Sequence, residues 1–273
     1  MSARFAASRK GWKLARAVVV SCVTVAFAFA AAAAGPAISR GALWEVVRTC
    51  VANHALTGAA FPCLEVNVSG GDERGFVILR APLGAPDLIL APTRKIVGVE
   101  DPSLRNLEAP NYFEDAWNSR AFLSNGRQTP LARNDVALAV NSRFSRTQDQ
   151  LHIHIGCLPR HVKKALETLA PELPEDKWAR IGRSTTVGNT LHGSGLWGRR
   201  VDQETLAGVN PFRLAAEVGP DEAESRSLSM IAVVGVQLAN GRGGFVLLAS
   251  YDDPSHPNEQ FSAEDFLDPS CSL

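Results

Sequence analysis

The chain has no excess of charge of either sign: Lys plus Arg and Asp plus Glu each number 28 among 273 residues. A protein whose main partner is nucleic acid needs a basic excess to neutralise phosphates, so the balance excludes that class of protein. Cysteine is sparse, at five residues, and charge is absent from residues 17–34. The uncharged run and the few cysteines say more about where the protein resides than its overall composition does.

The first forty residues differ in kind from the rest. Residues 17–34 are uncharged and mostly apolar, and a basic cluster precedes them: Arg4, Arg9, Lys10, Lys13 and Arg16. This order is typical of a secretory signal, and the apolar run reaches the lower limit for crossing a bilayer. We expect residues 1–40 to be an uncleaved, single-pass signal anchor; the alternative is cleavage after Ala32-Ala33-Ala34. The positive-inside rule places residues 41–273 outside the cytoplasm.

Cysteine usage agrees with export. Cys22 lies in the apolar run, which leaves Cys50, Cys63, Cys157 and Cys271 in the exported part. Four cysteines in an oxidising compartment indicate two disulfides, with three possible connectivities. We favour Cys50–Cys63, which closes a short loop, and Cys157–Cys271, which ties down the C-terminal tail. Four unpaired buried thiols are the alternative.

The periodicity of apolar residues predicts an α+β fold, an antiparallel sheet with packed helices. The expected helices are 41–53, 111–124, 160–169 and one near 202–208 capped by Asp202. The expected strands are 63–68, 75–79, 88–91, 136–140, 149–157, 229–238 and 244–250. The Pro- and Gly-rich stretch within 160–190 is where the domain 41–273 would subdivide. Residues 244–248 echo residues 75–79, either by chance or because the second half is a degenerate internal duplicate.

Two histidines alternate with apolar residues in the run Gln150-Leu151-His152-Ile153-His154-Ile155. Residues i and i+2 of a strand project to the same face, so the two imidazoles should lie side by side. The apolar residues between them should face a core. Cys157 lies three residues after His154, an odd number, so its side chain should project from the opposite face of the strand. We therefore expect its disulfide to hold the C-terminal tail over the back of the sheet, away from the histidines. The pattern indicates a site for chemistry or for metal.

The loop before this strand carries groups suited to phosphate. Arg143 and Arg146 offer fixed charge and several N–H donors, and Ser142, Ser145 and Thr147 add hydroxyls. A neutral imidazole nitrogen can attack phosphorus while arginines stabilise charge on the transferring group. The loop and the strand together predict attack on a phosphoanhydride.

These residues resemble the histidine-triad (HIT) superfamily, in which three histidines alternate with apolar residues on a strand after a phosphate-binding loop. Within it, the chain resembles the membrane-associated CDP-diacylglycerol pyrophosphatases over nearly the whole exported part. The similar segments are the apolar anchor, Ala42-Leu43-Trp44, Pro62-Cys63-Leu64-Glu65-Val66, Gly75-Phe76-Val77, Pro92-Thr93, Asn141-Ser142-Arg143, Arg146-Thr147-Gln148, His152-Ile153-His154-Ile155 and Gly244-Phe245-Val246-Leu247-Leu248.

The resemblance implies a HIT-like fold that hydrolyses CDP-diacylglycerol to CMP and phosphatidate at the periplasmic face of a bacterial inner membrane, without cofactor or metal. It implies that His152 is the nucleophile, forming a cytidylyl-histidine, and that His154 bonds the phosphate or the leaving oxygen. The implied substrate-binding positions are Asn141, Ser142, Arg143, Arg146, Thr147 and Gln150, the last replacing the first triad histidine. Asp87 stands where many members have a further histidine, and the resemblance gives it no role.

Other interpretations stay open. The spacing of His152 and His154 also suits zinc, with His161 or His192 as candidate third ligand. Both histidines could instead be structural residues on a solvated face. A periplasmic nucleotide- or lipid-binding protein without turnover is a third interpretation, and a broader hydrolase of soluble nucleotide diphosphates is a fourth. The anchor favours a substrate that stays in the bilayer. Arg199-Arg200 either contact a head group or lie on the surface.

Overall fold

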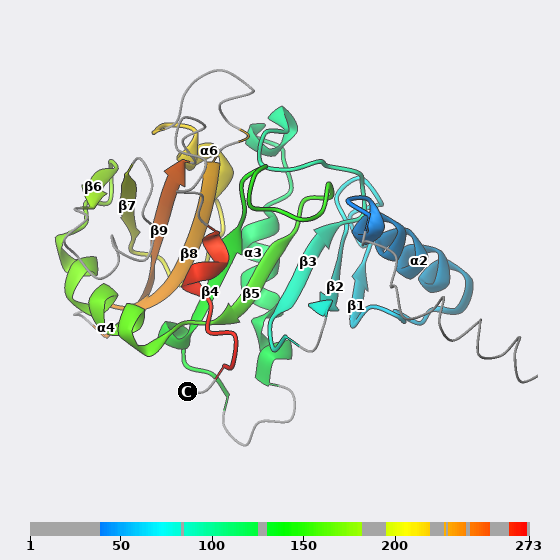
Figure 1. Cartoon of the computed structure of the whole chain (residues 1–273), viewed down its shortest axis with the longest axis horizontal. Coiled ribbons are helices and arrows are strands. Elements are labelled where there is room, and N and C mark those ends of the chain that lie inside the picture. Colours follow the sequence, from blue (N-terminus) through cyan, green and yellow to red (C-terminus); the bar gives the residue numbers. More distant parts are fainter. Residues whose placement is uncertain are drawn as a thin grey trace, which may run out of the picture. The chain divides into compact units, whose positions relative to one another are not determined.

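One antiparallel sheet dominates the compact unit Arg40–Leu273 (Figure 1). The computed structural model describes residues 39–82, 85–124, 130–181, 195–218, 227, 229–238, 241–251 and 262–271. In this part of the chain the nine strands have the order β1-β2-β3-β5-β4-β8-β9-β7-β6, and every neighbouring pair is antiparallel. Their bounds are β1 Glu65–Asn67, β2 Phe76–Arg80, β3 Leu88–Pro92, β4 Val136–Val140, β5 Ile153–Cys157, β6 Ala179–Ile181, β7 Leu196–Val201, β8 Ser229–Gln237 and β9 Gly243–Tyr251.

The helices are few and short, so the predicted α+β class with a large antiparallel sheet is confirmed. The α-helices are α2 Ala42–Thr57, α3 Tyr112–Asn118, α4 Arg160–Leu169 and α6 Pro211–Ala215. The 3-10 turns are η2 Pro102–Arg105, η3 Ser119–Ser124, η4 Arg133–Asp135, η5 Ala170–Glu172 and η7 Ala263–Phe266. None of the helices in the described ranges is long and apolar enough to cross a membrane. Residues 1–38 of the predicted anchor lie outside those ranges.

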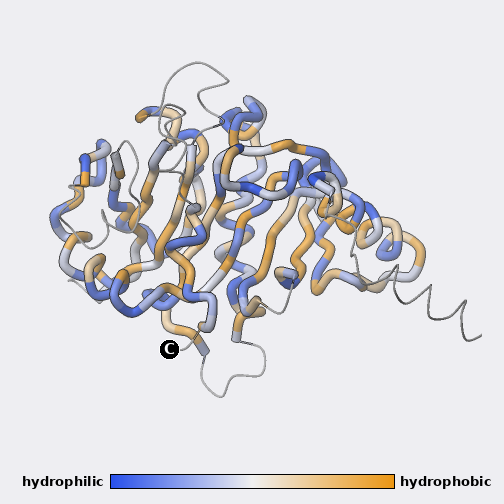
Figure 2. Tube along the Cα trace, viewed as in Figure 1, coloured by the Kyte–Doolittle hydropathy of each residue, from blue (hydrophilic) through white to orange (hydrophobic). Residues whose placement is uncertain are grey.

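The two faces of the sheet bury different cores, and hydrophobic residues follow the central strands (Figure 2). On one face, α3 and α6 contribute to a cluster with Ile153 and Ile155 of β5, and Trp117 packs edge-on against Phe245 with ring centroids 4.8 Å apart. The other face carries two separate clusters. One joins α2 to β1, β2 and β3, and the other joins α4 and η7 to β4, β8 and β9.

The histidine strand lies at the boundary between those two clusters. In the register of the sheet, His154 of β5 pairs with Ile89 on one side and with Ala139 on the other. Ile89 belongs to the cluster under α2, and Ala139 belongs to the cluster under α4 and η7. The sheet therefore places polar imidazoles in a gap between two apolar coverings, on the face opposite Ile153 and Ile155.

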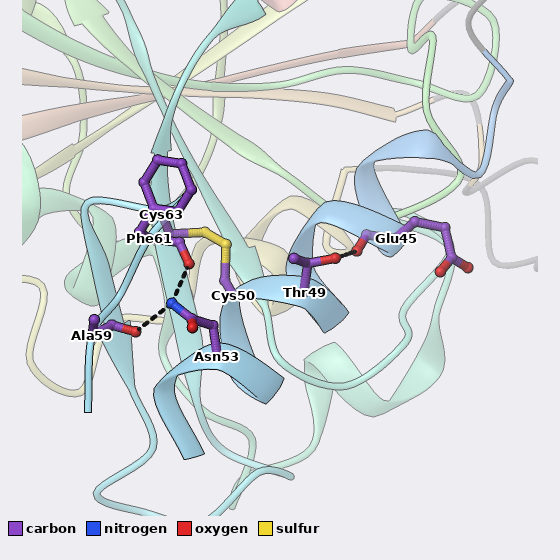
Figure 3. The surroundings of a disulfide bond; sticks show 7 residues. All are labelled: Glu45, Thr49, Cys50, Asn53, Ala59, Phe61 and Cys63. Atoms are coloured by element: carbon purple, nitrogen blue, oxygen red, sulfur yellow. Dashed lines mark hydrogen bonds between the residues drawn. A yellow bond between two sulfur atoms is a disulfide. The ribbon is translucent and has the colours of Figure 1, made fainter. Parts of the chain in front are cut away.

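Helix α2 is fastened at its C-terminal end (Figure 3). Gly58 ends the helix at φ 76°, a left-handed conformation that glycine adopts without a Cβ penalty. Asn53 donates to the carbonyls of Ala59 and Phe61 across the following loop. The predicted Cys50–Cys63 disulfide is confirmed, with a Cα–Cα distance of 5.8 Å. Closing a loop of this length stabilises a fold by about 3 kcal/mol in the chain-entropy account.

The second predicted disulfide, Cys157–Cys271, is also present, but the predicted course of the tail is wrong. Ala263, Phe266 and Leu267 pack with Ala137 and Ala139, on the face that carries the histidines. A Cβ added at Gly156 would lie 3.2 Å from Leu267. The η7 turn (red in Figure 1) therefore covers the histidine face rather than the back of the sheet.

Three local predictions also need correction. Residues 202–208 form no helix; α6 starts later, capped by the Asn210 side chain, and Asp202 instead accepts from Arg200 at 2.6 Å. The histidine strand begins at Ile153 rather than at residue 149. Strands β6 and β7 were not predicted, because glycines in this stretch resemble a loop in sequence. In β7, Gly198 packs closely, since a Cβ there would lie 2.8 Å from Cδ1 of Ile181, which would have to move.

Candidate active site

The two histidines lie side by side as predicted. The ring centroids of His152 and His154 are 5.1 Å apart, with 63° between the ring planes. His154 belongs to β5, and His152 is the residue immediately before the first residue of that strand, Ile153. Both side chains are buried, so neither is a residue of a solvated face.

His152 is held in a form suited to nucleophilic attack. Its Nδ1 lies 2.7 Å from the carbonyl oxygen of Gln150, and because a carbonyl only accepts, Nδ1 carries the ring proton. Burial, followed by the neighbouring His154, lowers the pKa of His152 to about 3. The ring is therefore neutral at physiological pH, with the lone pair on Nε2.

His154 lies between two carboxylates. Its Nδ1 donates to Oδ2 of Asp87 at 2.9 Å, and its Nε2 lies 3.3 Å from Oε1 of Glu264. Asp87, to which sequence analysis assigns no role, thus orients the second imidazole. Sequence reasoning missed Glu264 altogether, because nothing local to the η7 turn connects it with a strand more than a hundred residues earlier.

Gln150 is fully buried and cannot serve as a free donor in this conformation. Its side-chain nitrogen donates to the carbonyls of Pro92 and Arg94, both at 3.0 Å, which uses both amide hydrogens. Its Oε1 is buried and has no hydrogen-bond partner within the described ranges. The amide fixes the chain before His152, and its predicted contact with substrate stays a prediction.

The Arg146 side chain is buried and held in an ion pair. Its Nη1 and Nη2 donate to the two carboxylate oxygens of Glu100 at 2.8 and 2.7 Å, and its Nε lies 3.4 Å from Asp149. The guanidinium occupies the space over Gly98, where any Cβ would collide with it. These bonds use three of the five N–H groups of the guanidinium, and a phosphate contact by Arg146 stays a prediction.

Asn141 and Ser142 organise the chain around the site. The Asn141 amide donates to Glu264 at 2.6 Å, and the Ser142 hydroxyl accepts from the backbone of Phe144 and Ser145. Neither side chain is exposed. Their observed contacts are with the protein itself, and a substrate contact stays a prediction for both.

Arg143 and Thr147 are the predicted loop residues that remain exposed. Arg143 lines a cavity of about 590 Å³ together with Lys95, Val97, Glu100, Arg146, Asp149 and Ser227. Glu100 and Asp149 are already paired with arginines, whereas Lys95 and Arg143 form no ion pair with any described residue. The cavity therefore offers two cations to an anionic ligand.

The segment before α2 clamps the same loop from outside. Arg40 donates to both carboxylate oxygens of Asp149, at 2.8 and 2.7 Å, and to the carbonyl of Arg146 at 3.1 Å. The backbone of Leu43 donates to the side chain of Gln148 at 2.8 Å. The chain that follows the predicted anchor thus helps to fix the loop that precedes the histidines.

The zinc interpretation finds no support in the described part of the chain. Within the ranges given above, no group of three or more His, Cys, Asp and Glu side chains is arranged to hold a metal ion. His161 is exposed on α4, and His192 lies outside the described residues. Arg199 and Arg200 are paired with Glu217 and Glu175, so their observed role is structural.

A neutral imidazole with an available nitrogen, beside a carboxylate-oriented second imidazole, is typical of hydrolases in which histidine attacks phosphorus. Comparison with known proteins makes the class specific. The family model described as CDP-diacylglycerol pyrophosphatase matches residues 38–273, and the chain belongs to that family. It is 33% identical to the CDP-diacylglycerol pyrophosphatase of Yersinia pestis over 233 residues, 85% of this chain and 84% of the relative. It is 29% identical to a probable CDP-diacylglycerol pyrophosphatase of Mycobacterium leprae over 239 residues, 87% and 82% respectively.

Proposed function

We propose that the protein hydrolyses the phosphoanhydride of CDP-diacylglycerol to CMP and phosphatidate, with His152 as the nucleophile. The family gives the substrate class. The observation that carries the mechanism is the 2.7 Å contact from His152 Nδ1 to the Gln150 carbonyl, because it leaves Nε2 with its lone pair. A neutral nitrogen nucleophile needs no separate base to activate it.

In the first step, Nε2 of His152 attacks the phosphorus attached to cytidine. The bond from that phosphorus to the bridging oxygen breaks, phosphatidate leaves, and a cytidylyl-histidine remains. His154 donates its Nε2 proton to the leaving oxygen, with Asp87 holding the ring from Nδ1. Lys95 and Arg143, the two cations of the 590 Å³ cavity without an ion-pair partner among the described residues, neutralise the diphosphate. Water then releases CMP in a second step.

The surroundings of the cavity suit a lipid substrate. Val97 and Phe144 are exposed to 42% and 45%, unusually high for large apolar side chains, and each lies within two residues of Lys95 or Arg143. Exposed apolar groups interleaved with cations are the combination that binds an anionic membrane surface. Together with the predicted anchor, they support a single-pass location at the bacterial inner membrane with the site in the periplasm. A HIT-like fold agrees with the histidine strand at the centre of an antiparallel sheet, and internal duplication stays a prediction.

The decisive assay for activity incubates the purified protein with CDP-diacylglycerol in mixed micelles and measures CMP by chromatography. We expect CMP and phosphatidate in equal amounts. Binding of the lipid without either product would favour the periplasmic binding protein. A parallel reaction with a CDP-alcohol that lacks acyl chains tests the broader hydrolase, which would cleave both substrates equally well.

A further inference from the structure

Glu264 is the one carboxylate brought to the histidines from the far end of the chain. Its Oε1 lies 3.3 Å from Nε2 of His154 and accepts from Asn141 at 2.6 Å. Its side chain is 42% exposed, whereas that of Asp87 on the other ring nitrogen is 14% exposed. Within the described ranges it forms no ion pair with Lys or Arg. Glu264 therefore touches the site and solvent at once.

The segment that carries Glu264 is fastened by several independent bonds. The Asn141 side-chain oxygen accepts from the Ser262 hydroxyl at 3.0 Å and from the Ala263 backbone at 2.8 Å. The backbone of Asp268 donates to the carbonyl of Cys157 at 2.7 Å, beside the disulfide to Cys271. Packing of Ala263 and Phe266 on the sheet adds an apolar contribution. The carboxylate is thus positioned by the fold rather than placed at random on a loose tail.

We propose that Glu264 is the general base of the second step, the hydrolysis of the cytidylyl-histidine; this inference rests on the proposed function. His154 serves the first step, in which the leaving oxygen needs a proton. The second step needs the reverse, a group that takes a proton from water. A solvent-reachable carboxylate next to the paired imidazoles supplies that acceptor.

The step balances without any further reactant. The oxygen of a water molecule bonds to phosphorus while the Glu264 carboxylate takes one of its protons. The bond between phosphorus and His152 Nε2 breaks, and its electron pair returns to the imidazole, which is neutral again. CMP leaves, and Glu264 passes the proton to Nε2 of His154, 3.3 Å away, which replaces the proton given to phosphatidate in the first step. The site returns to the state that the structure shows.

Quench-flow kinetics of a Glu264→Gln variant on CDP-diacylglycerol test this assignment. We expect phosphatidate to form rapidly to one equivalent per protein and then stop, while CMP release slows about 100-fold or more, the usual range for loss of a general base. Intact-mass analysis should show the cytidylyl adduct accumulating. Glu264→Asp should recover part of the second step.

Asp265→Asn is the matched control. Asp265 lies in the same turn and closes its capping box with Ser262. A general weakening of the turn should therefore show in Asp265→Asn as well, in both steps. The inference is overturned if Glu264→Gln turns over at the wild-type rate, or if it slows both steps equally with no adduct. Absence of both products with wild-type protein would instead overturn the proposed function itself.

Discussion

The buried pair of Arg146 and Glu100 allows a quantitative test of whether Arg146 supports the loop or binds substrate. The Arg146 side chain is 4% exposed and that of Glu100 22%. Removing one partner of a buried pair costs about 3–5 kcal/mol, because it leaves the other charge uncompensated. Glu100 keeps some access to water, so we expect Arg146→Met to cost about 2–3 kcal/mol, at or just below the lower end of that range. For a chain of this size the melting temperature should fall by about 4–12 °C.

Thermal unfolding followed by circular dichroism measures this change, and a double-mutant cycle assigns it to the pair. Arg146→Met combined with Glu100→Gln should recover part of the loss, since the stranded carboxylate is gone. The matched control is Arg48→Met, which breaks the exposed pair with Glu45. An exposed pair of this kind is worth under about 1 kcal/mol, so the control should melt within about 4 °C of wild type.

The opposite outcome would contradict the structural role of Arg146. If Arg146→Met keeps the wild-type melting temperature but raises the KM for CDP-diacylglycerol many-fold, the guanidinium serves the substrate. The predicted phosphate contact would then be correct.

Three further predictions concern charge at the site. Since the native pKa of His152 is about 3, against an ordinary value of 6.5, the native site rejects a proton that the unfolded chain accepts. Relative to His152→Asn, the wild type should lose free energy of unfolding as pH falls from about 6.5 to 3, and the difference between the two proteins should stay constant above about pH 6.5. Denaturation at a series of pH values measures this difference, and a difference that stays constant down to about pH 3 would refute the prediction. Asp87→Asn should lower kcat about 10- to 100-fold, the value of a charge-assisted hydrogen bond of about 1.5–3 kcal/mol, with little change in KM; a change in KM alone would refute orientation of His154. Dialysis against EDTA should leave activity intact, because a nitrogen nucleophile needs no metal-bound hydroxide, and rescue by zinc after loss would favour a metallohydrolase.

Features with a local cause could be predicted from sequence. The short, wholly apolar run of residues 136–140 predicts β4 to the residue, and the spacing of His152 and His154 places their rings together. Both disulfides were favoured among the three connectivities that four cysteines allow, and both are present. Each of these depends on neighbours in sequence or on a small number of possible pairings.

The remaining features depend on packing between distant segments. The ion pair of Arg146 with Glu100 has no local signal in the sequence, because Glu100 lies in another loop; the predicted phosphate contact of Arg146 stays a prediction. The prediction that the tail lies behind the sheet used only the strand face from which Cys157 should project. In the structure, the apolar residues of η7 are buried against β4 on the histidine face. That same misplacement hid Glu264. The helix near 202–208 failed because the Asp202 carboxylate pairs with a neighbouring arginine instead of capping a turn.

The most direct test of the account is the turnover of His152→Ala on CDP-diacylglycerol, with folding verified by its melting temperature. If His152 is the nucleophile, CMP formation should fall by several orders of magnitude and no cytidylyl adduct should form. His161→Ala, which changes an exposed histidine on α4, should keep wild-type activity. A His152→Ala protein that keeps more than about a tenth of wild-type turnover would contradict the central claim, since losing a covalent nucleophile cannot be so mild.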